Sequence, residues 1–159
     1  MHLKLSGPPP LSSIVSTAST MMRTWLTAEK TYEGFPLMLR RPADFDVESL
    51  RPGLPTLTVV THKFTERKPN GLPQPDYNHG LAKMDHELVT AFDVDRMGVP
   101  ALIETFGGER NYYFYVAADT DVASTISAIA RRYPEEHISW SVRPDPEWDF
   151  IQRYAREQF

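Results

Sequence analysis

The stretch that decides the fold is ETFGGERNYYFYV, residues Glu104–Val116. Two strand-like runs flank the pair Gly107-Gly108, and glycine tolerates the positive φ angles of a tight hairpin turn. The run after the turn is aromatic and rich in strand-forming residues, which predicts a β-strand. Side chains alternate between the two faces of a strand, so this run has a core-facing set and an outer set. The core-facing set is Tyr112, Phe114 and Val116, and the outer set is Asn111, Tyr113 and Tyr115.

The composition is that of an ordinary globular protein. The 159 residues are 41% hydrophobic and 24% charged, and their formal net charge is −4. A chain of this length predicts one domain, which we assign to residues 23–159. The acidic balance argues against a protein that neutralises phosphate backbones, so we do not expect a nucleic-acid partner.

The sequence contains no cysteine and no long apolar run, and both absences bear on its chemistry and its location. There is no cysteine, which excludes disulfides, thiolate nucleophiles and cysteine-ligated metal sites. The lack of disulfides fits the cytoplasm, where we expect the protein to reside. No run approaches the roughly 18 apolar residues of a membrane span, so no membrane partner is expected. Residues 1–22 are rich in Pro, Ser and Thr and are predicted to be a mobile extension, with a signal peptide and a start codon assigned too far upstream as alternatives.

The first half of the chain predicts three strands and one helix. Residues 23–32 and 35–41 form a hairpin around Glu33-Gly34, and Pro36 predicts that the second of these strands lies at a sheet edge. Residues 42–55 are a solvated loop or a single helical turn. Residues 56–64 are dense in β-branched side chains and predict a central strand. Apolar residues recur at helical spacing over residues 75–95, which predicts a helix. Gly98, just beyond this range, is expected to end it.

The second half continues from the hairpin at Gly107-Gly108 with a helix, a strand and a terminal helix. Asp119 or Thr120 is expected to cap the first helix, and Pro134 closes it. Residues 137–143 alternate as a last strand. The sequence Asp145-Pro146-Glu147-Trp148 predicts the start of a short helix that ends near residue 157.

The predicted fold is α+β. Six inner elements follow the order βαββαβ of a ferredoxin-like unit, with an antiparallel sheet and both helices on one face. The crossover rule makes the strands that begin at Thr56 and His137 neighbours. The first hairpin either extends this sheet or covers one of its ends, and a short C-terminal helix follows.

Landmarks spread along the chain resemble the family called domain of unknown function 695. They are Glu33-Gly34, Pro36 and Arg40, then Gly71-Leu72-Pro73, then Thr105, Gly108, Arg110, Phe114 and Tyr115, and finally Asp145-Pro146 with Trp148. The resemblance covers nearly everything after residue 22. The family has no established activity to carry over. Some members look as if joined to a domain similar to ribonuclease E regulator B, which implies a regulatory setting.

Acidic and histidine residues do not form a metal motif in the sequence. His79 and His86 lie seven residues apart on a helix, about 10 Å by the rise per residue, which is too far for one metal ion. We interpret Asp85-His86-Glu87 as a solvated helix surface and expect no metal and no cofactor. The acidic loop at Asp44, Asp46 and Glu48 lacks the glycine turn and the closing glutamate of a calcium loop.

Enzyme chemistry is not expected, and we assign no catalytic residue. Glu29 and Glu104 could form a carboxylate pair for acid–base work, but a pairing of each with Arg40, Arg110 or Arg143 is favoured. In an RNA-binding sheet of this topology, Tyr113 and Tyr115 would stack bases, with Lys63 and Arg143 nearby. The acidic charge and a poor match to the RNA-binding strand motif argue against that function.

A protein-binding or regulatory module that acts through the open sheet face is therefore the favoured function, with a protein partner or a second copy bound there. The alternative is an enzyme or small-ligand protein in which Glu and Arg residues meet in one pocket. Trp148 is included among the candidate surface residues, although a position as a lid over the core is favoured for it. The predicted surface residues are Glu29, Arg40, Glu104, Arg110, Tyr113, Tyr115, Arg143 and Trp148.

Overall fold

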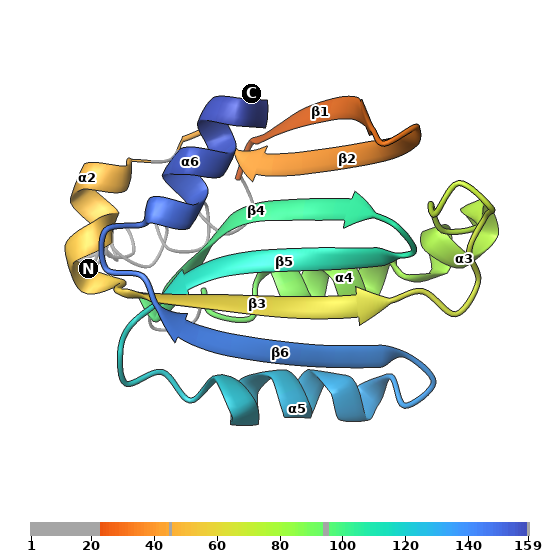
Figure 1. Ribbon diagram of the computed structural model, residues 1–159. Helices are drawn as coiled ribbons and strands as arrows, with labels where there is room; N and C mark the ends of the chain where they lie inside the picture. Colours follow the sequence, from red (N-terminus) through yellow and green to blue (C-terminus); the bar gives the residue numbers. More distant parts are fainter. Residues whose placement is uncertain (1–22, 45, 94–95, 159) are drawn as a thin grey trace, which may run out of the picture.

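The computed structural model describes residues 23–44, 46–93 and 96–158, and the predicted extension 1–22 lies outside them. The fold is α+β, with a six-stranded antiparallel open sheet that has helices on both faces (Figure 1). The strands are β1 (Trp25–Tyr32), β2 (Phe35–Pro42), β3 (Thr56–Lys63), β4 (Gly98–Phe106), β5 (Glu109–Val116) and β6 (His137–Pro144). The helices are α2 (Val47–Leu50), a 3-10 turn (Arg51–Gly53), α3 (Pro75–Gly80), α4 (Ala82–Val89), α5 (Val122–Arg132) and α6 (Asp149–Gln158).

The strands lie in the order β1-β2-β4-β5-β3-β6. The hairpin of β4 and β5 and the pairing of β3 with β6 are confirmed. The first hairpin extends the sheet, because β2 pairs with β4. The edge position predicted from Pro36 is wrong for β2, which lies between β1 and β4. The β2–β4 ladder covers only Met38 to Arg40, so Pro36 lies beyond it and its missing N–H costs no bond to β4.

One core lies between the sheet and the pair α4 and α5; in Figure 1, α4 lies behind the strands and α5 lies below β6. Tyr112, Phe114 and Val116 are fully buried in it, which confirms the predicted inner face of β5. They meet Met84 and Leu88 of α4, together with apolar residues of α5. The alternation of side chains in β5 thus gives the sheet an apolar face that packs against α4 and α5.

A second core lies on the opposite face, under α6 (Figure 1). The two helices of the predicted inner unit, α4 and α5, share the first face, and the C-terminal helix, for which no face was predicted, covers the other. Leu39 and Leu57 of the sheet are buried there with Trp148 and Ile151. Burial of such side chains supplies roughly 25 cal/mol per Å² of apolar surface, which holds α6 on the sheet.

Helix boundaries differ from the predicted ones at several places. The single helix expected over residues 75–95 is two helices, and the break follows Gly80, a residue type that disfavours helix interiors. Gly98 opens β4, where a Cβ atom would lie 2.7 Å from Val116 Cγ1. Asp121, rather than Asp119 or Thr120, caps α5 by accepting from Ser124 N at 3.1 Å. Helix α6 begins at residue 149, later than predicted.

Candidate functional site

The eight predicted surface residues do not share one surface. Tyr115 and Trp148 are completely buried, so their inclusion among the surface residues is wrong, and the favoured position of Trp148 over the core is confirmed. Tyr115 has the predicted strand face, but α6 covers it. Trp148 Nε1 donates to the Leu54 carbonyl at 2.8 Å, which fixes the indole over the sheet.

Asp145 joins β5 to the start of α6. Its carboxylate accepts from Tyr115 OH at 2.7 Å and from the amides of Asp149 at 3.0 Å and Phe150 at 3.2 Å. These amides belong to the first turn of α6, where backbone donors lack helical partners. Burial, together with the hydrogen bond to Asp145, raises the pKa of the Tyr115 phenol above its ordinary value. Tyr115 is therefore a neutral donor that anchors α6.

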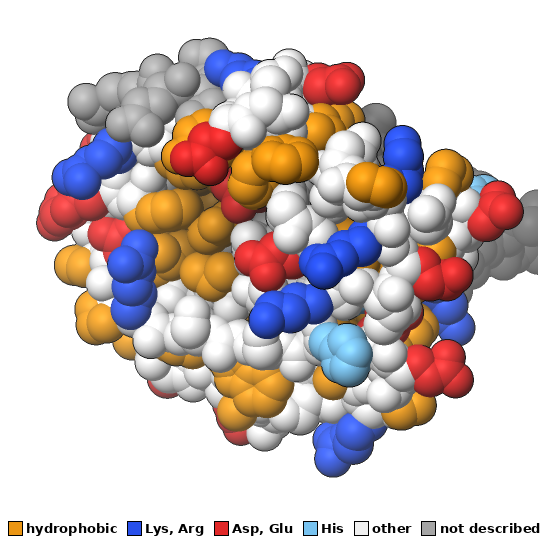
Figure 2. Space-filling view, turned by 45° about the vertical axis from the view of Figure 1, so that its right-hand side comes forward, with side chains coloured by type: hydrophobic (Ala, Val, Ile, Leu, Met, Phe, Trp, Pro, Cys, Tyr) orange, Lys and Arg blue, Asp and Glu red, His pale blue; other side chains and the backbone are white. Residues whose placement is uncertain are grey.

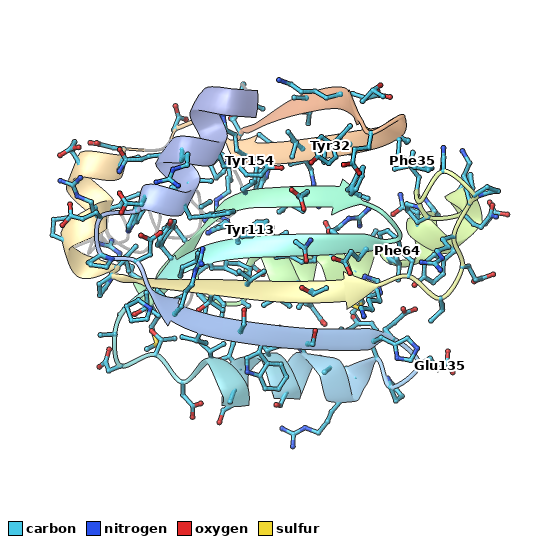
Figure 3. All side chains as sticks on the ribbon, viewed as in Figure 1. Tyr32, Phe35, Phe64, Tyr113, Glu135 and Tyr154 are labelled. Carbon is cyan, nitrogen blue, oxygen red and sulfur yellow. The ribbon has the colours of Figure 1, made fainter. Side chains whose placement is uncertain are left out.

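Two groups of aromatic side chains remain partly exposed on the sheet face that carries α6. At the turn end, Tyr32 is 53% exposed and Phe35 48% exposed, and the Tyr32 and Phe106 rings meet edge to face at 5.6 Å. Next to α6, Tyr113 stacks on Phe150 with ring centroids 4.8 Å apart. Figure 3 shows Tyr32 and Phe35 at one end of this face and Tyr113 and Tyr154 at the other.

We call the strip of sheet between these two groups the aromatic trough. One side of the trough consists of Tyr32, Phe35 and Phe106, and the other side consists of Tyr113, Phe150 and Tyr154. Its floor is polar. Thr61 Oγ1 donates to Asn111 Oδ1 at 2.7 Å, and Asn111 Nδ2 donates to Glu104 Oε1 at 3.2 Å. Tyr154 OH donates to the other oxygen of Glu104. Figure 2 shows hydrophobic side chains gathered in a hollow on this face, with charged side chains around it.

Arg143 lies at the α6 end of the same face. Its guanidinium carbon is 5.7 Å from the centre of the Phe150 ring, and it lines a hollow of about 330 Å³ beside α6 with Phe150 and Tyr154. Glu104, Tyr113 and Arg143 are therefore the predicted surface residues that the structure places around the trough.

Arg40 and Arg110 lie on the opposite face of the sheet, where they meet at Asp85. Arg40 Nη2 is 2.7 Å and Arg110 Nη1 is 3.6 Å from Asp85 Oδ1. The prediction that Asp85 belongs to a solvated helix surface is wrong, because its side chain is only 20% exposed. Burial opposes ionisation of Asp85, but its hydrogen bonds and charge interaction with Arg40 prevail and lower its pKa.

The carboxylate pair considered from the sequence is not formed. In the sheet, Glu29 pairs with Met38 of β2 and Glu104 pairs with Leu39, the next residue of β2. Consecutive residues of a strand point to opposite faces, so the two carboxylates also lie on opposite faces. Glu104 accepts from Asn111 and Tyr154, not from Arg40, Arg110 or Arg143. A single pocket with all the predicted Glu and Arg residues does not exist within the described residues.

The chain matches the family of unknown function DUF695 over residues 23–154. It belongs to this family. The comparisons with curated proteins and with solved structures give no match. Eight of the residues that carry the resemblance lie at two places in this DUF695 domain. Arg40, Leu72, Pro73, Thr105 and Arg110 surround the cleft at Asp85, and Tyr115, Asp145 and Trp148 anchor α6.

The DUF695 domain also contains a buried polar cluster that sequence reasoning missed. His62 Nε2 lies 2.8 Å from Glu136 Oε2, which also accepts from Tyr77 OH at 2.7 Å. His62 is fully buried, and its Nδ1 has no hydrogen-bond partner among the described residues. Burial lowers the pKa of His62, although Glu136 opposes this effect. Residue 62 and residue 136 are far apart in sequence, so no local pattern could reveal the pair.

Two further searches cover the described part of the DUF695 domain. None of its groups of three or more His, Cys, Asp or Glu side chains is arranged to hold a metal ion. No described helix has both the length and the apolar character needed to cross a membrane.

Proposed function

We propose that this domain is a protein-binding module and that it holds an amphipathic helix of a partner protein in the aromatic trough. The observation that carries the proposal is the exposure of Tyr32 and Phe35 opposite the stacked pair Tyr113 and Phe150. Aromatic side chains exposed together on one face are typical of binding sites rather than of free surface.

The width of the trough supports a helix as the occupant. Phe106 pairs with Glu109, and Tyr113 lies four residues further along β5, so the backbone positions of Phe106 and Tyr113 are about 14 Å apart along the strands, and Tyr154 reaches into this span as far as Glu104. A helix with its side chains is about 10–12 Å across. Helix α6 already packs on the same face, and helix axes pack about 8–10 Å apart. A second helix beside α6 would bury both aromatic sides at once.

The polar floor supports a particular kind of helix. Glu104 and Glu109 share this face with Asn111 between them in the same strand pair. A basic side chain in the middle of the partner's apolar stripe would meet Glu104, while apolar side chains on either flank meet the aromatic rings. The partner is thus an amphipathic helix with a Lys or Arg in its apolar stripe.

The geometry weighs against the two alternatives from the sequence. Base stacking on Tyr113 and Tyr115 would require removal of α6, because Phe150 and Trp148 lie on these rings. An enzyme with Glu and Arg in one pocket is not supported, because Glu104 and Arg40 lie on opposite faces.

We also propose that β3 to β6 with their helices are a ferredoxin-like unit to which the first hairpin was added. The order β4-β5-β3-β6 and the position of α4 and α5 on one face support this assignment. In this view the added hairpin supplies one side of the trough, and a regulatory role follows from partner binding there.

The experiment compares two variants that change exposed aromatic rings on opposite faces of the sheet. Tyr32→Glu changes an exposed ring in the trough, and Trp140→Glu changes a ring that is 38% exposed on the opposite face of β6. Each protein is used to isolate partners from the cells of its source, and the bound proteins are quantified against the unmodified domain. We expect at least one partner to be lost with Tyr32→Glu and kept with Trp140→Glu. Equal recovery of every bound protein by both variants would overturn the proposal.

A further inference from the structure

A cleft of about 670 Å³ lies on the sheet face opposite the aromatic trough. Strands β2 and β4 form its floor, and α3, α4 and the loop of residues 66–73 form its walls. Its volume lies within the roughly 300–1,000 Å³ of pockets that bind small molecules. The proposed partner helix would not use it.

The charges that line this cleft are unequal. Arg40, Arg110 and Lys68 supply three positive charges against the single carboxylate of Asp85, although the whole chain carries a net charge of −4. Lys68 is half-buried as a residue, and its side-chain ammonium forms no hydrogen bond or ion pair with any described residue. An ammonium without a counter-ion, close to two guanidinium groups, favours an anion in the space beside it.

The two guanidinium groups are held in place before any ligand arrives. Asp85 accepts from Arg40 at 3.2 Å and 2.7 Å and from Tyr112 OH at 2.7 Å. Arg110 Nε donates to Thr105 Oγ1 at 2.9 Å, and its Nη2 donates to Asn78 Oδ1 at 3.1 Å. A guanidinium has five N–H donors, and these bonds to Asp85 leave some of Arg40's donors for a ligand. Such fixed donors lower the ordering cost of binding.

The loop that carries Lys68 is also fixed. Gly108 N donates to the Gly71 carbonyl at 2.8 Å, and Lys68 N donates to the Leu72 carbonyl at 2.8 Å. Gly71 has a φ of +87°, and a Cβ there would lie 3.0 Å from Gly107 Cα. Only glycine fits this contact, which ties the loop to the turn between β4 and β5.

The remaining wall of the cleft is apolar. Met38, Ile103, Leu72 and Pro73 line it beside the charged groups. A ligand that satisfies both parts therefore has an anionic head and an apolar body.

We propose that this cleft binds a small organic anion, a carboxylate or a phosphate carried on an apolar body. The head lies among Lys68, Arg40 and Arg110, and the body lies on the apolar wall. Carboxylate and phosphate share the oxygen acceptors that guanidinium and ammonium groups recognise.

The test titrates the purified domain with hexanoate, hexyl phosphate, hexanol and inorganic phosphate and follows backbone amide shifts by NMR. Because no protein partner is added, the outcome is independent of the proposed helix binding. We expect saturable binding of hexanoate or hexyl phosphate, with shifts in residues 66–73 and at Arg40, and the tighter ligand identifies the head group. Lys68→Ala should weaken this binding about five- to tenfold. Lys63→Ala, which removes an exposed lysine on the other face, should change it less than about twofold.

Each of the following results would overturn the proposal. The first is the lack of saturable binding by either amphiphilic anion. The second is equal affinity for hexanol, which would remove the role of the charges, or equal affinity for inorganic phosphate, which would remove the role of the apolar wall. The third is an equal effect of Lys68→Ala and Lys63→Ala on the affinity for the anions. The Lys68 side chain has no described partner, so its removal should not unfold the domain, and an equal effect would show that Lys68 does not bind the head group.

Discussion

The Trp148 indole lies flat on the Tyr115 ring, with ring centroids 4.1 Å apart and an angle of 11° between the planes. Residue 115 belongs to a central strand and residue 148 to the turn before α6, so this stack closes the C-terminal segment over the sheet. Helix α6 begins at the next residue, and the aromatic trough lies on the part of the same face that α6 leaves uncovered.

Loss of the indole should be costly. Trp148→Ala is expected to lower the free energy of unfolding by about 3–5 kcal/mol, because it empties a fully buried site and removes the bond to the Leu54 carbonyl. Trp140→Ala, at an exposed site, should cost less than about 1 kcal/mol. Urea denaturation of both variants measures the difference, and similar losses would contradict the role of Trp148 as the anchor.

The phenol of Tyr115 should matter to α6 more than to the whole fold. Tyr115→Phe keeps the ring stack but leaves Asp145 without its 2.7 Å donor, a change of about 1–2 kcal/mol. Amide hydrogen exchange should show faster exchange in the first turn of α6 and little change in β3. Tyr32→Phe is the control, since the Tyr32 ring is exposed. Unchanged exchange in α6 would show that Asp145 does not need this donor.

The sequence predicted what depends on local patterns. Alternation placed Tyr112, Phe114 and Val116 in the core and put Tyr115 on the correct face. It could not show that α6 returns over Tyr115, because the contact of Trp148 with Leu54 joins residues 94 positions apart.

The two arginines of the cleft illustrate the same limit. Arg40 and Arg110 were predicted as surface residues, but their meeting point at Asp85 depends on a contact across 45 residues. Lys68 had no signal at all, since its position depends on the fit of Gly71 against the turn at Gly107. Local sequence thus predicted the strands and their faces, and tertiary packing determined which side chains meet.

The buried histidine should make stability depend on pH. Because the pKa of His62 is lowered in the folded state, the unfolded chain binds a proton that the folded chain excludes. The free energy of unfolding should therefore be fully present above about pH 6.5 and fall as the pH drops below it. The lowered pKa of Asp85 acts in a different window, and its contribution should be lost only in acid near or below about pH 4.

Urea denaturation at several pH values between 5 and 7.5 checks this expectation. His62→Leu should flatten the dependence, whatever its effect on the stability itself, while His79→Gln at an exposed position should leave the slope unchanged. An unchanged slope in His62→Leu would show that another group controls it.

The loop contact at Gly71 should tolerate no side chain. Gly71→Ala is expected to lower the free energy of unfolding by at least about 1–2 kcal/mol, because the residue has a φ of +87° and its Cβ would press on the Gly107 backbone. Gly53→Ala is the matched control, since nothing lies within 4 Å of its Cβ position. It should change stability by less than about 1 kcal/mol. Thermal unfolding compares the two, and equal shifts would contradict the described packing of the loop.

Site-specific photo-crosslinking tests the central claim, a partner helix in the aromatic trough, most directly. A photoreactive phenylalanine replaces Phe106 in the trough or, as the control, Trp140 on the opposite face of β6. The proteins are expressed in the cells of their source, and the crosslinked peptides are identified by mass spectrometry. We predict crosslinks from position 106, and not from position 140, to one segment with apolar residues at helical spacing and a Lys or Arg among them. The account would be contradicted if position 106 gave no crosslinks or the same crosslinks as position 140. It would also be contradicted if the crosslinks from position 106 joined two copies of this chain or fell in a segment without apolar residues at helical spacing.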